Sequence, residues 1–124
     1  MRDLAAYIGA EKIALADART HDDIIAYTSG LMHVSAAALC MDFHPQMSGA
    51  FTAGAFRDCT RIANINPGMW SELLLLNKDP LLKHLDHYIG RLLRLREALA
   101  EGDGETLYAL LEKAGENKRE MLKR

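Results

Sequence analysis

The run IIAYTSGLMHVSAAALCM, from Ile24 to Met41, decides the fold of this chain because it contains no Asp, Glu, Lys or Arg. Its apolar residues recur on every side of a helix, so a helix formed here must be covered all round. The run also contains Thr28, Ser29 and His33, which make it too polar for a typical membrane span. We interpret it as the buried helix of an all-α domain that has no membrane partner.

The start of this helix is marked by short polar residues. Thr20 followed by Asp23 resembles a capping box with an acidic third position. The sequence His21-Asp22-Asp23 also places negative charge in the first turn, where the helix dipole favours it. The pattern predicts a helix that begins near Thr20.

Covering such a helix is difficult for one small chain. With 124 residues, the protein can bury only a modest core. A symmetric homodimer, in which the partner covers the remaining face, is the simplest solution. A neighbouring domain of the same polypeptide would serve equally well, and the composition does not decide between the two.

The second half of the chain carries clear helix signals. Asn66-Pro67 and Asp79-Pro80 each place a capping residue before a proline at the first helical position. Gly102-Asp103-Gly104 then interrupts the pattern, which predicts two long amphipathic helices that form an antiparallel hairpin. The apolar positions of these two helices are Leu81, Leu85, Tyr88, Leu92, Leu95 and Leu99, followed by Leu107, Leu110, Leu111, Ala114 and Met121.

The first 16 residues have a different pattern. Asp3 to Ile8 predicts a helical turn, Gly9 a stop, and Lys12 to Leu15 a short strand. A lone strand fits poorly beside an all-helical remainder. We therefore predict that residues 1–16 are the remnant of a preceding domain and that residues 17–124 form the helical domain.

The segment GAFRDCTRIANINPGMW, from Gly54 to Trp70, has the composition of a small-molecule site. It sets Arg57 and Arg61 four residues apart, on one face of a helix, and ends in the only tryptophan of the chain. A fixed guanidinium beside an aromatic ring suits a small carboxylate, because the planar fork binds two oxygens at once. A solvated helix face followed by a core tryptophan is an equally good interpretation of the residue types.

Charge and cysteine usage narrow the partners. The formal net charge is -2 and the pI is near 6.2. The sequence has no basic face with interleaved aromatic residues, so it does not predict nucleic-acid binding. Cys40 and Cys59 predict reduced thiols packed in the core of a cytoplasmic protein, and MRDLAAYIG does not resemble an export signal. His84 and His87 are spaced as a metal pair but have no third ligand at suitable spacing, so we predict no metal.

Several blocks in order resemble a known family. HDDIIAYTSGLMHV (21–34), GAFRDCTRIA (54–63) and NPGMWSELLLLNKDPLL (66–82), followed by the long helices, resemble the carboxy-terminal helical domain of prephenate dehydrogenase. The resemblance runs from about His21 to the end. It implies an interlocked homodimer and an enzyme that oxidatively decarboxylates prephenate to 4-hydroxyphenylpyruvate with NAD or NADP, in tyrosine biosynthesis.

The resemblance also implies what this chain lacks. In the family, an amino-terminal nucleotide-binding domain holds the dinucleotide and the catalytic histidine. No glycine-rich phosphate loop follows a strand here, so we expect no catalytic residue, no bound cofactor and no activity from this chain alone. Residues 1–16 then correspond to the last element of that missing domain.

The family's binding residues map onto five positions. Arg61 falls at the substrate-binding arginine, and His33 at the second histidine of a Ser-His-Leu-Pro-His pattern, where it could donate a hydrogen bond to substrate. His21 falls at a histidine near the domain junction. Gly54 and Trp70 fall at positions that approach the partner subunit's site.

Two features depart from this picture or qualify it. The pattern reads Ser29-Gly30-Leu31-Met32-His33 here, so glycine replaces the first histidine and methionine the proline. Arg57 is predicted to form structural ion pairs, with Asp58 or Glu72 as partners. Without the resemblance, a lone histidine on an apolar helix, such as His33, is more often a hydrogen-bonded core residue than a ligand contact. For the whole chain, the alternative function is a stand-alone helical interaction module that dimerises and has no enzymatic activity.

Overall fold

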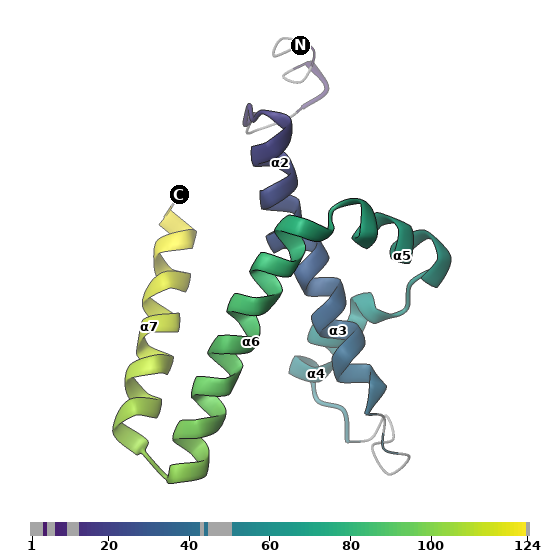
Figure 1. The fold of residues 1–124 in the computed structure, drawn as a ribbon. Helices are drawn as coiled ribbons and strands as arrows, with labels where there is room; N and C mark the ends of the chain where they lie inside the picture. Colours follow the sequence, from purple (N-terminus) through teal and green to yellow (C-terminus); the bar gives the residue numbers. More distant parts are fainter. Residues whose placement is uncertain (1–3, 5–6, 10–12, 43, 45–50, 124) are drawn as a thin grey trace. The chain divides into compact units, whose positions relative to one another are not determined.

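The computed structural model describes residues 4, 7–9, 13–42, 44 and 51–123. These residues form helices and connecting turns, without a strand among them, which confirms the predicted all-α class. The elements, shown in Figure 1, are α2 (Ala18–Ile25), η1 (Ala26–Gly30), α3 (Leu31–Met41), α4 (Gly54–Thr60), η2 (Arg61–Ala63), α5 (Pro67–Leu76), α6 (Lys78–Glu101) and α7 (Gly104–Lys123). The chain divides into two compact units, Met1–Leu82 and Lys83–Arg124.

The amino-terminal strand is not formed where the chain is described. Ile13 to Leu15 have no regular secondary structure, and Lys12 lies outside the described residues. A strand needs a neighbour to accept and donate its ladder hydrogen bonds, and the described part of the chain supplies none there. Gly9 has a positive φ of 88°, a conformation open to glycine, which fits its predicted role as a stop.

The uncharged run lies in one continuous helical segment made of α2, η1 and α3 (Figure 1). Its cap is Asp17 rather than Thr20: Asp17 Oδ1 accepts a hydrogen bond of 2.7 Å from the Thr20 N–H. Thr20 therefore lies inside the first turn as a donor. In η1 the helix widens to a π-turn, in which the Leu31 N–H donates to the Ala26 carbonyl.

This helical segment is not covered on all sides by the chain itself. Its buried side chains are Ala26, Leu31 and Ala36, two of which are small. The large apolar residues Ile24, Ile25, Tyr27, Met32, Leu39 and Met41 are all exposed. The chain alone therefore covers only part of this segment, and its burial on every side by a partner stays a prediction.

The thiols follow the same pattern. Cys40 at the end of α3 and Cys59 in α4 are both exposed and free, so the prediction of core packing is wrong for this chain.

By length and composition, Ala18–Met41 could also cross a membrane, a property that it shares with core helices of soluble proteins.

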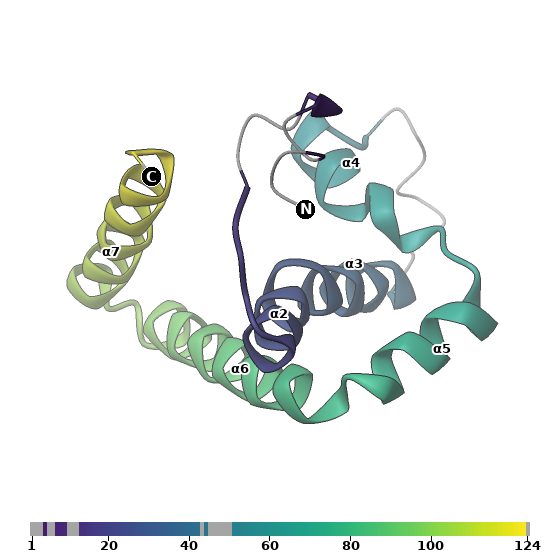
Figure 2. The ribbon, with the colours of Figure 1, turned by 90° about the horizontal axis from the view of Figure 1, so that it is seen from above.

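α4 and η2 pack against α3 and hold the segment that carries the two arginines. The α-helix ends at Thr60, so Arg61 opens a short 3-10 turn instead of lying on the same α-helix as Arg57. The predicted shared helix face is thus divided between two elements. Figure 2 shows α4 to one side of α3.

Asn66 and Pro67 start α5 as the sequence predicts. Asn66 Oδ1 accepts a 3.0 Å hydrogen bond from the Met69 N–H, and Pro67 occupies the first helical position. The next helix, α6, begins two residues before the predicted Pro80, at Lys78. Pro80 is tolerated because the N–H groups of a helix's first turn have no partner within the helix.

In the second unit, the chain reverses direction between α6 and α7 (Figure 1), as predicted. Gly102 adopts a positive φ of 68°, and its N–H donates to Leu99 O at 3.3 Å while the Asp103 N–H donates to Ala98 O at 2.9 Å. These two bonds are a Schellman motif. Asp103 then caps α7 through a 2.9 Å hydrogen bond from the Thr106 N–H to its Oδ1.

The two capping aspartates predict acid-sensitive stability. Hydrogen bonds from the side chain and then the backbone of Thr106 lower the pKa of Asp103. The pKa of Asp17 is lowered in the same way, chiefly by the hydrogen bond from the backbone N–H of Thr20. Their contribution is complete at neutral pH and is lost as pH falls through the folded-state pKa. Asp103→Asn keeps a capping oxygen, so it should reduce the acid dependence of thermal unfolding, measured by circular dichroism, with little effect at neutral pH. Asp103→Ala removes the cap and should therefore also lower stability at neutral pH. Identical behaviour of the two variants at neutral pH would contradict the capping role.

Candidate functional site

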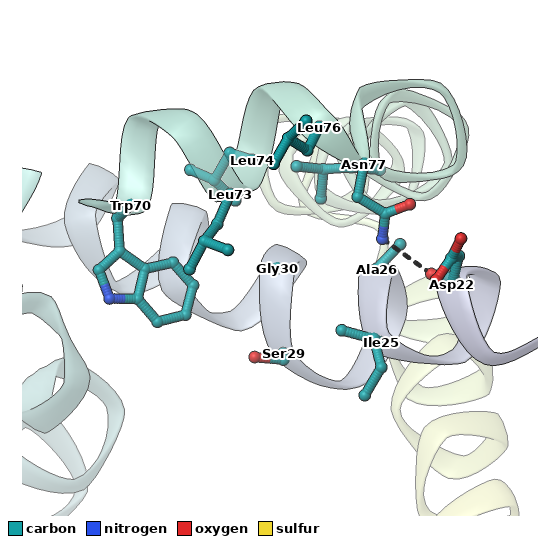
Figure 3. A pocket seen from close by; sticks show the side chains of 11 residues that line it. Asp22, Ile25, Ala26, Ser29, Gly30, Trp70, Leu73, Leu74, Leu76 and Asn77 are labelled. Carbon is teal, nitrogen blue, oxygen red and sulfur yellow. Dashed lines mark hydrogen bonds between the residues drawn. The ribbon is translucent and has the colours of Figure 1, made fainter. Parts of the chain in front are cut away.

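A cavity of about 350 Å³ lies in the first unit, between α5 and the α2–η1 segment (Figure 3). Its apolar lining consists of Ile25, Ala26, Leu73, Leu74, Leu76 and Leu81. Trp70 closes one end, and Asn77 stands at the other end opposite Asp22. The Asn77 Nδ2 group donates a 2.9 Å hydrogen bond to the Asp22 carbonyl, which ties the end of α5 to α2.

Trp70 connects this cavity to a predicted site residue, His33. The two rings are stacked, with centroids 3.6 Å apart and planes inclined by 25°. His33 Nδ1 lies 2.9 Å from the Ser29 carbonyl oxygen. Because a carbonyl oxygen only accepts, Nδ1 carries a hydrogen, and Nε2 is left to accept in the neutral ring or to donate in the protonated ring. The ring is thus fixed in position by a stack and a hydrogen bond.

Arg61 is exposed and lies at the start of η2, the turn that packs against α3, the helix of His33. Within the described part of the chain, neither Arg61 nor Arg57 forms an ion pair. The expected pairing of Arg57 with Asp58 or Glu72 is therefore not formed. Both guanidinium groups are available to an anion, and the elements that carry them, α4 for Arg57 and η2 for Arg61, both pack against α3, the helix of His33.

His21 and Gly54 lie apart from the His33 and Trp70 stack. His21 is on α2, where its Nδ1 is 3.2 Å from Asp22 Oδ1, and both side chains are mostly exposed. It precedes His33 by twelve residues, which separates the two by roughly 18 Å at the rise of a helix. Gly54 is the exposed first residue of α4, with open space where a Cβ would lie. One small molecule would not span His21 and His33 of the same chain.

Comparison with known proteins gives the family. The sequence profile described as prephenate dehydrogenase, dimerization domain, matches residues 17–113, which is most of the chain.

The chain belongs to the prephenate dehydrogenase dimerization-domain family.

Curated relatives of this dimerization domain are longer proteins. The present chain is 39% identical over 102 residues to the cyclohexadienyl dehydrogenase of Zymomonas mobilis, and the match covers 77% of this chain and 35% of that protein. It is 36% identical over 93 residues to the prephenate dehydrogenase of Bacillus subtilis, covering 71% and 25% respectively. The chain therefore spans only about a third or a quarter of the length of these relatives.

Solved structures agree on the fold. The arogenate dehydrogenase of Synechocystis matches with a TM-score of 0.78 and 23% identity, over 97% of this chain and 48% of that one. The prephenate dehydrogenase of A. aeolicus, in complex with hydroxyphenyl propionate and NAD+, matches with a TM-score of 0.73 and 26% identity, over 89% and 40%. The match covers almost the whole dimerization domain, and less than half of each solved chain.

The replacement of a pattern histidine by Gly30 has a structural counterpart at the cavity. A Cβ at position 30 would lie 3.2 Å from Leu81 Cδ1 and 3.7 Å from Leu74 Cδ2. Leu81, which is 7% exposed, therefore occupies space that any side chain at position 30 would need. Glycine and leucine are complementary in size at this point.

Sequence reasoning found one end of this site and missed most of its wall. It identified His33 and Trp70. Leu73, Leu74 and Leu81 indicated only that the segment is helical, not that they line a cavity. The available signal was Asn77, an amide that interrupts the apolar run at the end of α5. Among the described residues, no group of three or more His, Cys, Asp or Glu could hold a metal.

The size relation between Gly30 and Leu81 is testable by a double-mutant cycle. Gly30→His should destabilise the domain by about 1 to 3 kcal/mol through overpacking, and Leu81→Ala by about 2 to 5 kcal/mol through the cavity it leaves. Together they should cost at least about 0.5 kcal/mol less than their sum, because the shortened side chain at position 81 makes room for the new ring. Urea unfolding at fixed protein concentration measures each value.

Gly90→His is the matched control for this cycle, because position 90 in α6 has open space where a Cβ would lie. It should combine additively with Leu81→Ala. Additive costs for the Gly30 pair would show that the two positions do not compete for the same space.

Proposed function

We propose that this chain is the dimerising and prephenate-binding part of a prephenate dehydrogenase. The enzyme would oxidatively decarboxylate prephenate to 4-hydroxyphenylpyruvate with NAD or NADP, in cytoplasmic tyrosine biosynthesis. Family membership and the longer relatives of the chain support this role. The structural observation that carries it is an arginine without an ion pair among the described residues, Arg61, on a turn packed against the helix of the oriented His33.

Arg61 is the proposed ligand of a prephenate carboxylate. Its guanidinium offers two parallel N–H donors to two carboxylate oxygens, and no protein carboxylate of the described residues competes for them. Arg61 is exposed in the single chain, so its selectivity would come from neighbouring groups that exclude water once the site closes.

His33 is the proposed second polar contact. Its Nδ1–H is engaged with Ser29, so it would contact the substrate through Nε2. A protonated ring donates to a carboxylate, whereas a neutral ring accepts from a hydroxyl group. Trp70, stacked on the ring, would keep His33 in this orientation and shield it from water.

The remaining predicted residues fit a site shared between subunits. We assign Gly54 to a position that approaches the partner's site in a homodimer, and His21 to the junction with a nucleotide-binding domain. Trp70, which the family resemblance also assigns to the partner's site, is stacked on His33 of its own chain. The open space at Gly54 and the distance of His21 from His33 support separate locations. Exposed apolar residues of α2, α3 and α5 that do not line the cavity, such as Ile24, Met32 and Leu75, supply surface that a second copy would cover.

Hydride transfer would depend on residues outside this domain. The described residues offer no strand followed by a glycine-rich turn, so they do not fit a dinucleotide. The domain would bind and orient prephenate, and it would not be competent alone. Reduction of NAD by this chain in the presence of prephenate would contradict that assignment.

The two arginines provide an internal control for carboxylate binding. Arg61→Ala should weaken prephenate binding by about 30-fold, or roughly 2 kcal/mol, since a ligand charge loses its partner. Arg57→Ala removes the same charge from the neighbouring helix and should change affinity by less than about threefold. Isothermal titration with prephenate, and with hydroxyphenyl propionate, measures both variants. Equal affinity of Arg61→Ala and the unmodified chain would refute the role.

A further inference from the structure

We propose that the cavity between α5 and the α2–η1 segment binds an uncharged apolar group, of the size of a six-membered ring. This site is separate from the carboxylate site assigned to Arg61, which does not line the cavity. The proposal rests on the cavity's own residues and would stand if Arg61 had another role. Its volume of about 350 Å³ lies within the range of about 300 to 1,000 Å³ common for small-molecule pockets.

The charges around the cavity select against anions. Among the described residues, no Lys, Arg or His lines it, and its one charged lining residue is Asp22, which is acidic. An anion that entered would lose hydration without gaining an ion partner, and would also meet the Asp22 carboxylate. The Asn77 amide is already engaged with the Asp22 carbonyl at 2.9 Å. An uncharged group avoids these costs.

The walls of the cavity suit a ring. Leu73 and Leu74 project from α5 on one side, and Gly30 leaves the opposite helix without a side chain, as Figure 3 shows. Because Gly30 has no Cβ, Leu81 can approach to complete an aliphatic wall. Trp70 adds an aromatic wall at one end, which favours contact with a flat or chair-shaped ring.

Trp70 makes the site directly observable, because it is the only tryptophan of the chain and lines the cavity. Cyclohexylmethanol and cyclohexanecarboxylate are a suitable pair of probes, since they share one ring and differ chiefly in charge. Cyclohexylmethanol should shift the Trp70 emission with a dissociation constant on the order of 1 mM, as expected for a ligand of this size. Cyclohexanecarboxylate should bind at least about tenfold more weakly.

Two variants of α5 locate the binding. Leu73 lines the cavity, whereas Leu75 lies on the same helix, is 68% exposed and does not line it. Leu73→Phe should fill part of the space and weaken cyclohexylmethanol binding at least about fivefold, and Leu75→Phe should leave it unchanged within about twofold. Far-UV circular dichroism checks that both variants keep the helical fold.

Three results would overturn the proposal. These are equal affinity for the two probes, equal effects of Leu73→Phe and Leu75→Phe, and no response of Trp70 to cyclohexylmethanol. The last result would mean that the cavity does not take up the ring. Because the probes are not substrates, these outcomes are independent of prephenate binding by Arg61: the cavity site can fail while the carboxylate site holds, and the reverse.

Discussion

An uncharged helical segment needs apolar cover on every side, and this requirement governs the first unit of the chain. From Ile24 to Met41 there is no Asp, Glu, Lys or Arg to keep any face in water. Yet α4 and η2, which pack on α3, leave most of its large apolar side chains exposed, and only Ala26, Leu31 and Ala36 are buried. Apolar surface of this extent is typical of an interaction site, which agrees with membership of a dimerization-domain family.

The same helical segment also shapes the candidate site. Its π-turn at Ala26–Gly30 includes the Ser29 carbonyl that orients His33, and its Gly30 admits Leu81 to the cavity wall. Trp70 then joins the two features, since it stacks on His33 and lines the cavity. One helix thus organises both a polar contact with a fixed hydrogen-bonding direction and an apolar cavity whose described lining carries no positive charge.

Local chemistry made much of the fold predictable from sequence. The Asn66-Pro67 start of α5 and the break at Gly102-Asp103 were correct because each depends on hydrogen bonds within a few residues. The burial predicted for Cys40 and Cys59 was wrong, because burial depends on what packs against a helix rather than on its own residues.

The site was predictable only in part for a related reason. The positions of Arg61, His33 and Trp70 came from family-like blocks, and the stack of His33 on Trp70 brings two of them together. The relation of Gly30 to Leu81 joins residues far apart in the sequence, which no local pattern reveals. Likewise, the Asn77 hydrogen bond to Asp22 depends on how α5 folds back over α2.

The exposed face of the helical segment needs a second copy of the chain to cover it. Static light scattering of the purified chain at micromolar concentration measures this without any ligand. We predict a particle of twice the 13.8 kDa chain mass. A folded, helical particle of 13.8 kDa would contradict the account, because the uncharged helix would then be stable in water without its partner.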